Sequence, residues 1–301
     1  MKRLKVKIAE NKKISQNFYR MRVESAYLAK NSKPGQFVEV KCFDGFEPLL
    51  RRPLGVHRIL NNGIEILYEV VGKGTELLSR KRAGDTIDVI GPLGNGFFVQ
   101  RTACSVQRTA IIVAGGIGVA PLVALAESLA YSVQRIAYRK NPKIYVLIGA
   151  KTKSHVLCVD EFKKIGCKVI VSTEDGSMGT KGLATDLLED LLSASAKGGS
   201  ASGGKRYPLP PKADPPQAEN AILYACGPVA MLKTVAKIAE TKRIPCQVSM
   251  EERMACGVGV CLGCPVKVRT TSTQYAIHNT QYEYKMVCKD GPVFNAEDIA
   301  W

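Results

Sequence analysis

The sequence predicts a multidomain protein in which an antiparallel β-barrel precedes an α/β domain with an open parallel sheet and a small C-terminal domain. Three observations predict this architecture. Apolar and polar residues alternate up to about residue 98, continuous apolar runs alternate with helical stretches from residue 109, and four of the ten cysteines gather near the C-terminus. A length of 301 residues fits two or three domains. We place the domains at 1–102, 108–246 and 247–301.

The first domain is predicted from half-buried strands that glycine or proline turns separate. Side chains of a strand point alternately to its two faces, so alternation indicates that one face is buried. About six short antiparallel strands in this domain predict a small barrel, which one helical stretch at 74–81 interrupts. The stretches of clearest alternation are 4–8, 19–23, 38–42, 64–70 and 87–89.

The second domain is predicted from apolar runs without alternation, which are typical of parallel strands covered on both faces. Strands that alternate with helices predict an open α/β sheet. The strands are expected at 110–114, 144–148, 168–171 and 221–225, and the helices at 120–129, 183–192 and 229–241. The segment 193–220 holds five prolines and many glycines and serines, so we expect a mobile insertion there.

Composition excludes several classes of protein. Hydrophobic residues make up 46% of the chain and charged residues 23%, which excludes a largely disordered chain. The N-terminus has no apolar signal segment, and the apolar run 110–126 is shorter than a membrane helix and contains glycines and a proline. We therefore expect a cytoplasmic protein with reduced cysteines and no membrane partner. The net charge of +16 is spread along the chain, which favours a solvated surface over a nucleic-acid site.

The spacing of four cysteines is the strongest chemical signal. Cys256, Cys261 and Cys264 follow the pattern C-x4-C-x2-C, and 23 residues separate Cys264 from Cys288. Plant-type 2Fe–2S clusters use this spacing with a distant fourth cysteine, and glycines inside the loop free its backbone to curl around a cluster. The alternative is a structural zinc ion held by four thiolates, which would fit a zinc-stabilised nucleic-acid-binding protein.

Two elements of the barrel suit a phosphate-bearing ligand. A guanidinium at the start of a strand can pair with a pyrophosphate, and small residues at a helix start expose backbone N–H groups. The alternative for each element is an ordinary structural role. The residues are Arg52, Pro53, Leu54 and Gly55 in the strand, and Gly74 and Thr75 in the helix.

Two loops at the carboxyl edge of the parallel sheet suit a dinucleotide. Open α/β sheets bind ligands at this edge, where glycines allow close approach to a pyrophosphate. The first loop departs from the full fingerprint, and no acidic residue ends the second strand. Lys151 and Lys153 stand there instead and could receive a 2′-phosphate, so the residues leave NAD and NADP open. The loop residues are Gly115, Gly116, Gly118 and Pro121, and Cys226, Gly227 and Pro228.

Taken in order, these motifs resemble the ferredoxin–NADP reductase superfamily, and within it the electron-transfer subunits of type B dihydroorotate dehydrogenases. The resemblance spans nearly the whole chain and is sharpest at 251–264 and 287–294. It implies FAD on the barrel, NAD at the two loops as electron acceptor, and a 2Fe–2S cluster on the four cysteines. For FAD it adds Leu67, Tyr68 and Glu69 to the barrel residues above. Gly55 replaces the usual serine, and insertions depart from the family near 100–108, 131–142, 193–220 and 270–284.

The resemblance implies an electron conduit in pyrimidine biosynthesis. An FMN-containing catalytic subunit would oxidise dihydroorotate to orotate, and this chain would carry the electrons through the cluster and FAD to NAD⁺. It implies a heterotetramer of two plus two subunits. No catalytic residue is assigned, and we expect no dihydroorotate oxidation by this chain alone. The nearest rivals are subunits of a related NAD(P)H:ferredoxin oxidoreductase or sulfide dehydrogenase, which tend to carry Asp where this chain has Cys256.

Overall fold

The structure is a computed structural model that describes residues 1–45, 47–99, 109–134, 143–193, 220–270 and 281–301. The chain divides into two compact units. The first unit, called the barrel–tail unit below, comprises Met1–Phe98, Ala120–Leu125 and Val248–Trp301. The second, called the sheet unit, comprises Val99–Val119 and Ala126–Gln247. The N-terminal and C-terminal segments therefore belong to one unit, and the predicted division into three domains stays a prediction.

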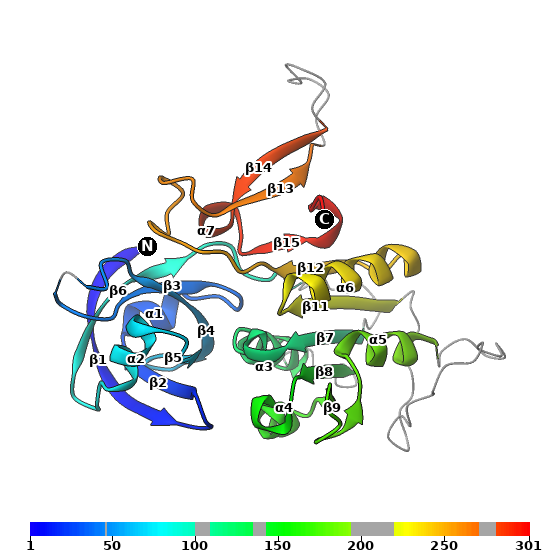
Figure 1. The fold of residues 1–301 in the computed structure, drawn as a ribbon, viewed down its shortest axis with the longest axis horizontal. Helices are drawn as coiled ribbons and strands as arrows, with labels where there is room; N and C mark the ends of the chain where they lie inside the picture. The colour runs from blue at the N-terminus through cyan, green and yellow to red at the C-terminus, as the bar shows by residue number, and fades with distance from the viewer. Residues whose placement is uncertain (46, 100–108, 135–142, 194–219, 271–280) are drawn as a thin grey trace. The chain divides into compact units, whose positions relative to one another are not determined.

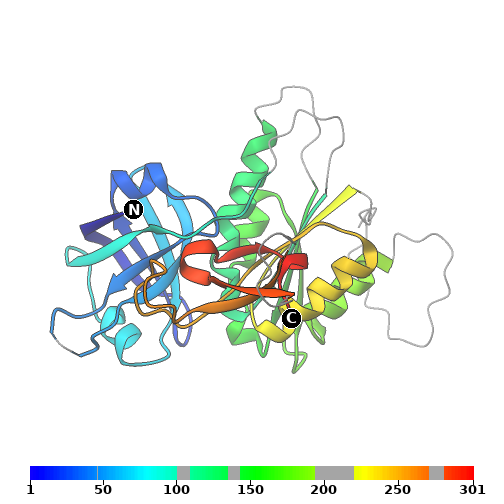
Figure 2. The same ribbon diagram turned by 90° about the horizontal axis from the view of Figure 1, so that it is seen from above.

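The N-terminal segment forms a closed barrel of six strands in the order β1-β2-β5-β4-β3-β6. It is coloured blue to cyan in Figures 1 and 2. All neighbouring strands pair antiparallel, which confirms the predicted barrel. The strands are β1 (Lys2–Lys13), β2 (Phe18–Glu24), β3 (Phe37–Lys41), β4 (Arg52–Leu60), β5 (Gly63–Glu69) and β6 (Thr86–Leu93).

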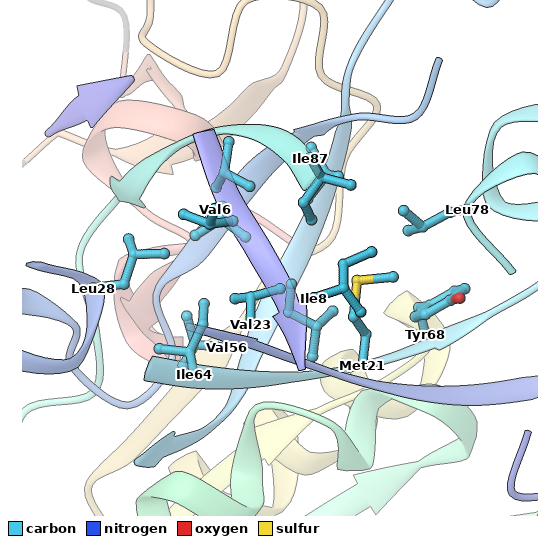
Figure 3. Packing of buried hydrophobic residues seen from close by; sticks show 14 of the residues in the cluster. Val6, Ile8, Met21, Val23, Leu28, Val56, Ile64, Tyr68, Leu78 and Ile87 are labelled. Carbon is cyan, nitrogen blue, oxygen red and sulfur yellow. The ribbon is translucent and has the colours of Figure 1, made fainter. Parts of the chain in front are cut away.

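Apolar side chains from every strand fill the barrel (Figure 3). In β1, Val6 and Ile8 are buried while Lys5 and Lys7 are exposed, so the alternation in the sequence reports the inner face. Helix α2 (Lys73–Ser79) matches the predicted helical stretch, and its Leu78 joins this core. Helix α1 (Ala26–Asn31) was not predicted, and it contributes buried Leu28.

The sheet unit carries parallel strands, as predicted. Pairing is parallel between β7 and β8, β8 and β9, β9 and β10, and β7 and β11. Strand β7 therefore lies between β8 and β11, where the strand order reverses. Ligands of open α/β sheets bind at such a point. The strands are β7 (Thr109–Gly115), β8 (Ile144–Ala150), β9 (Lys168–Thr173), β10 (Thr180–Lys181) and β11 (Ala221–Cys226), and β12 (Cys246–Ser249) leads the chain into the barrel–tail unit.

The helices of this part of the chain match the predicted positions to within a few residues, with one addition. Helix α4 (Val159–Ile165) was not predicted, because only its Phe162 is buried and no apolar period marks it. The other helices are α3 (Leu122–Gln134), α5 (Ala184–Ser193) and α6 (Val229–Lys242). No helix in the described ranges is long and apolar enough to cross a membrane.

The C-terminal segment begins with a loop and an antiparallel hairpin, which Figure 1 shows in orange and red. Strand β13 (Pro265–Arg269) pairs with β14 (Tyr282–Met286), and α7 (Val287–Asp290) and β15 (Val293–Asn295) follow. The last residues of the predicted insertion near 270–284 belong to β14. The insertions near 100–108, 131–142 and 193–220 lie largely outside the described residues. The predicted mobility of 193–220 therefore stays a prediction.

Candidate functional site

The four predicted cluster cysteines come together in the barrel–tail unit. Cys256, Cys261 and Cys264 lie in the loop between β12 and β13, and Cys288 lies in α7. The register of the hairpin brings the distant cysteine close, because Pro265 pairs with Met286 and the next backbone N–H, of Val287, donates to the carbonyl of Cys264 at 2.9 Å. The backbone N–H of Cys288 then donates to Cys264 Sγ at 3.4 Å.

The four thiols lie close to one another. The Cys256 side chain interacts with that of Cys261, and the Cys288 side chain interacts with those of Cys264 and Cys256. A two-iron cluster needs four thiolates shared between its irons. The closeness of the thiols and the C-x4-C-x2-C spacing both fit such a cluster.

Backbone N–H groups point at the sulfurs. Gly259 N donates to Cys288 Sγ at 3.1 Å, and the N–H groups of Val258 and Cys261 donate to Cys256 Sγ at 3.4 Å each. Burial opposes ionisation of Cys256, but these donors lower its pKa to about 6. Burial instead raises the pKa of Cys288. Metal ligation requires thiolates, which the N–H donors stabilise.

Glycine is required where the cluster loop meets the barrel. Gly257 has a φ of +69°, and a Cβ atom there would lie 2.6 Å from Cγ of Glu39 in β3. Asn95, which follows β6, donates through Nδ2 to the carbonyl of Asp290 at 2.9 Å. A Cβ on Gly35 would also meet Val293 at 3.0 Å. The C-terminal segment is therefore packed directly on the barrel.

Glu39 is a functional candidate that the sequence did not reveal. Its side chain is 1% exposed, and neither carboxyl oxygen has a hydrogen-bond partner among the described residues. Desolvation by burial raises the pKa of Glu39 to about 7; Arg51 and Arg52 oppose the shift, and Cys256 adds to it. In the sequence, Glu39 is merely the polar residue between Val38 and Val40, so only its contact with the cluster loop distinguishes it.

The predicted FAD residues of β4 and α2 lie together. A Cβ on Gly74 would be 2.8 Å from Nε of Arg52, so the absence of a side chain at residue 74 lets the guanidinium lie against the start of α2. The Thr75 hydroxyl accepts from Val71 N at 3.0 Å and donates to the Gly72 carbonyl. This arrangement leaves a cationic group beside small residues, which suits a phosphate-bearing cofactor.

Other predicted residues of this group lie elsewhere on the barrel. Pro53, Leu54 and Gly55 follow Arg52 along β4, and Leu67, Tyr68 and Glu69 end β5. The ring of Tyr68 belongs to the barrel core (Figure 3), and its hydroxyl donates to Asn11 Oδ1 at 3.0 Å. Burial raises the pKa of this hydroxyl. Packing of the Tyr68 ring in the core therefore explains why Tyr68 fits the alternating apolar pattern of its strand.

The two predicted nicotinamide loops meet at the carboxyl edge of β7 and β11. A Cβ on Gly118 would lie 2.5 Å from the Cys226 carbonyl oxygen, and one on Gly115 would lie 2.7 Å from Cδ of Pro228. Gly227 in turn approaches Gly115 closely. Gly116 has a φ of +54° and no described atom within 4 Å of its Cβ position. The glycines thus allow both loops to pack and leave one backbone position open.

Pro121, predicted with these loops, lies within the barrel–tail unit. Its Cβ is 3.8 Å from the Cβ position of Gly55 in β4. The adjacent Ala120 carbonyl lies 2.7 Å from Nδ1 of His57, a buried residue that we had not linked to any site. The residue that ends the glycine-rich turn is therefore placed beside the predicted flavin motif.

Comparison with known protein families gives two matches. Residues 251–300 match the iron-sulfur cluster binding domain of dihydroorotate dehydrogenase B. Residues 112–237 match the oxidoreductase NAD-binding domain. The first match contains all four cysteines, and the second contains Gly115 and Cys226.

Solved structures share this fold. The structure of an NADH-dependent reduced ferredoxin-NADP oxidoreductase matches with a TM-score of 0.71 and 29% identity, covering 98% of this chain and 90% of that chain. A ferredoxin NADP⁺ reductase from Neisseria gonorrhoeae matches with a TM-score of 0.60 and 15% identity, covering 80% of this chain and 92% of that chain. The second likeness bears on the fold alone.

Curated relatives are similar over nearly their whole length. The dihydroorotate dehydrogenase B (NAD(+)) electron transfer subunit of Geobacillus sp. (strain WCH70) is 36% identical, covering 99% of each chain. The protein of the same name from Desulforamulus reducens is 33% identical, covering 96% of this chain and 94% of that protein. This chain therefore belongs to the family of dihydroorotate dehydrogenase B electron transfer subunits.

Proposed function

We propose that the chain carries electrons from a dihydroorotate-oxidising partner to NAD⁺, through a 2Fe–2S cluster on Cys256, Cys261, Cys264 and Cys288 and an FAD on the barrel. The observation that supports this most is the closeness of the four thiols, three in a loop packed on the barrel and one in α7. When bound, FAD exchanges single electrons with an iron–sulfur cluster and a hydride with a nicotinamide, so it connects the two kinds of carrier.

The chain's own residues would bind and orient these groups. Arg52 would pair with the FAD pyrophosphate, with Gly74 and Thr75 beside it, while Pro53, Leu54 and Gly55 would support the flavin along β4. Leu67 and Glu69 would contribute through β5. In the sheet unit, Gly115, Gly116 and Gly118 would admit the NAD pyrophosphate to the edge of β7, with Cys226, Gly227 and Pro228 beside them.

The name of the relatives, electron transfer subunit, implies a catalytic partner. We propose that this partner is an FMN-containing dihydroorotate dehydrogenase subunit and that the complex holds two copies of each chain. The chain itself has no assigned site for dihydroorotate. Its part in pyrimidine biosynthesis would be to remove electrons from the partner as orotate forms.

The proposal predicts a division of activities between the two subunits. Purified under anaerobic conditions, the chain should hold one FAD and about two irons and should reduce artificial dyes with NADH. It should not convert dihydroorotate, and adding the FMN-bearing partner should produce dihydroorotate:NAD⁺ activity. Orotate formation by the chain alone would disprove the conduit function.

A second candidate, an NAD(P)H:ferredoxin oxidoreductase subunit, draws support from the likeness at a TM-score of 0.71. The same purified chain separates the two functions. If ferredoxin supports NAD(P)H turnover at a rate that the dihydroorotate-oxidising partner cannot match, the second candidate is the better description. The greater identity to the curated relatives, 33% to 36% in the two cases above, favours the first.

Arg52→Ala should weaken FAD binding. A hydrogen bond to a charged group contributes about 1.5–3 kcal/mol, which corresponds to roughly a tenfold to hundredfold increase in the dissociation constant. Flavin fluorescence released during dialysis measures the loss. Arg80→Ala is the matched control, because Arg80 caps the far end of α2, whose start lies beside Arg52, and among the described residues its side chain pairs with Glu76 on the surface. Equal retention of FAD by both variants would remove Arg52 from the site.

A further inference from the structure

Glu39 lies between two elements that the proposed function assigns to different cofactors. It stands in β3, where its backbone partner across the strand pair is Pro53 of the predicted flavin motif. Its neighbours Val38 and Val40 belong to the barrel core, so the Glu39 side chain leaves the barrel on the opposite face. There its Cγ and Oε1 lie 2.6 and 2.9 Å from the Cβ position of Gly257 in the cluster loop.

The Glu39 carboxyl is less well compensated than the other buried acids of the barrel. Asp88 forms ion pairs with Arg3 and Arg51 at 2.6 and 2.8 Å, and Glu65 pairs with Arg22 at 3.0 Å. Both Glu39 oxygens are buried without a hydrogen-bond partner among the described residues. An apolar side chain of similar shape would fill this position without the cost of burying a carboxyl group.

The nearby cations compensate Glu39 only in part. Arg51 and Arg52 favour its charged form and Cys256 opposes it. The Arg51 guanidinium, however, is bonded to the carboxyl and carbonyl oxygens of Asp88 at 2.8 and 2.9 Å, and its contact with Glu39 is to the backbone carbonyl at 3.4 Å. Arg52 donates to the Leu50 carbonyl at 2.7 Å. The carboxyl therefore adds negative charge beside the cluster loop.

We propose that Glu39 acts on the electron path through its charge, lying against the cluster loop and lowering the one-electron potential of the cluster. This inference rests on the proposed function, because it requires a cluster on Cys256 and its three partners. Charge interacts strongly across a site that excludes water. A carboxylate there makes the addition of an electron less favourable, and groups around the ligands are known means of setting cluster potentials.

The test uses the full chain loaded with cluster and FAD and follows the reduced cluster by EPR during a redox titration at pH 8.5. Glu39→Gln keeps the shape of the side chain and removes its charge. At the potential where the parent cluster is half reduced, the ratio of reduced to oxidised cluster should rise about tenfold in the variant, equivalent to 59 mV for one electron. Glu65→Gln is the control, since Glu65 is also buried in the barrel but lies on β5, beyond β4 from β3.

Each outcome decides the inference. An unchanged ratio in Glu39→Gln, or an equal rise in Glu65→Gln, overturns it. If Glu39→Gln fails to hold the cluster, Glu39→Asp decides, because it retains the charge on a shorter side chain. A cluster in Glu39→Asp with the parent ratio of reduced to oxidised cluster supports the inference, and a rise in that ratio, or loss of the cluster from both variants, overturns it. Absence of a 2Fe–2S signal from the parent chain would refute the proposed function instead, so the two failures are distinguishable.

Discussion

Replacing Cys261 with serine should abolish most of the reduced-state EPR signal of the purified chain and leave its FAD bound. The Cys261 side chain interacts with that of Cys256, and the substitution removes one of the four proposed thiolate ligands. The predicted FAD residues lie on β4, β5 and α2, away from this loop in the sequence. Iron content should fall to a small fraction of the parent value, while the flavin absorbance stays stoichiometric.

The control for this experiment is Cys246→Ser, because Cys246 stands in β12, ten residues before the first ligand and outside the loop. That variant should keep its iron and its EPR signal. Full retention of iron in Cys261→Ser would contradict the ligand assignment. Loss of FAD together with the cluster would show that the loop supports the barrel, and that Cys261 does more than bind metal.

The barrel and the parallel sheet could be predicted because their signals are local. The alternation of apolar and polar residues through Val6 and Ile8 indicates that one face of β1 is buried. The unbroken apolar run in β7 indicates that both faces of that strand are buried. The cluster loop could also be predicted, since three of its ligands lie within nine residues and their spacing is specific. The fourth, Cys288, was predicted from the motif, but the hairpin register between β13 and β14 that brings it close was not.

Features that depend on tertiary contact could not be predicted. Helix α1 is too short to show the helical period of apolar residues. Its local signal is the N-cap, where the Ser25 hydroxyl accepts from Leu28 N at 3.2 Å. In the sequence, Glu39 cannot be distinguished from other outward-facing strand residues, because what sets it apart is its closeness to Gly257 in the folded chain. The FAD assignment of Tyr68 stays a prediction, while its place in the core agrees with the alternation of β5. The burial of Glu39 depends on residues distant in sequence.

The exposed part of the cluster loop indicates where electrons would enter. Cys261 is exposed, and the residues on either side of it, Val260 and Leu262, are 79% and 66% exposed. Single exposed apolar residues are common on proteins. Here, however, two of them flank the accessible ligand of the proposed cluster. Because electron transfer slows steeply with distance, we expect the flavin of the proposed partner to approach a ligand that solvent can reach, and an apolar surface there favours a docked partner.

Introducing aspartate at both positions should therefore separate partner binding from the chemistry within the chain. A single hot-spot residue of an interface contributes about 2 kcal/mol or more. If one of the two residues is a hot spot, Val260→Asp with Leu262→Asp should weaken the complex by at least ~30-fold. Leu262 has a φ of +54°, a conformation that aspartate tolerates better than leucine, so the fold should not suffer. Size-exclusion chromatography measures the loss of the complex, and the dihydroorotate:NAD⁺ activity of the mixed subunits measures the loss of electron transfer.

Iron, FAD and NADH:dye activity of the double variant should match those of the parent, because no predicted cofactor ligand is changed. Leu183→Asp is the control, since Leu183 is also exposed but lies in the sheet unit, before α5. It should leave the complex intact. If the double variant binds the FMN-bearing partner as tightly as the parent, the partner does not dock on the cluster loop. Electrons would then have to enter the chain elsewhere, and the exposure of Cys261 would serve small soluble acceptors instead.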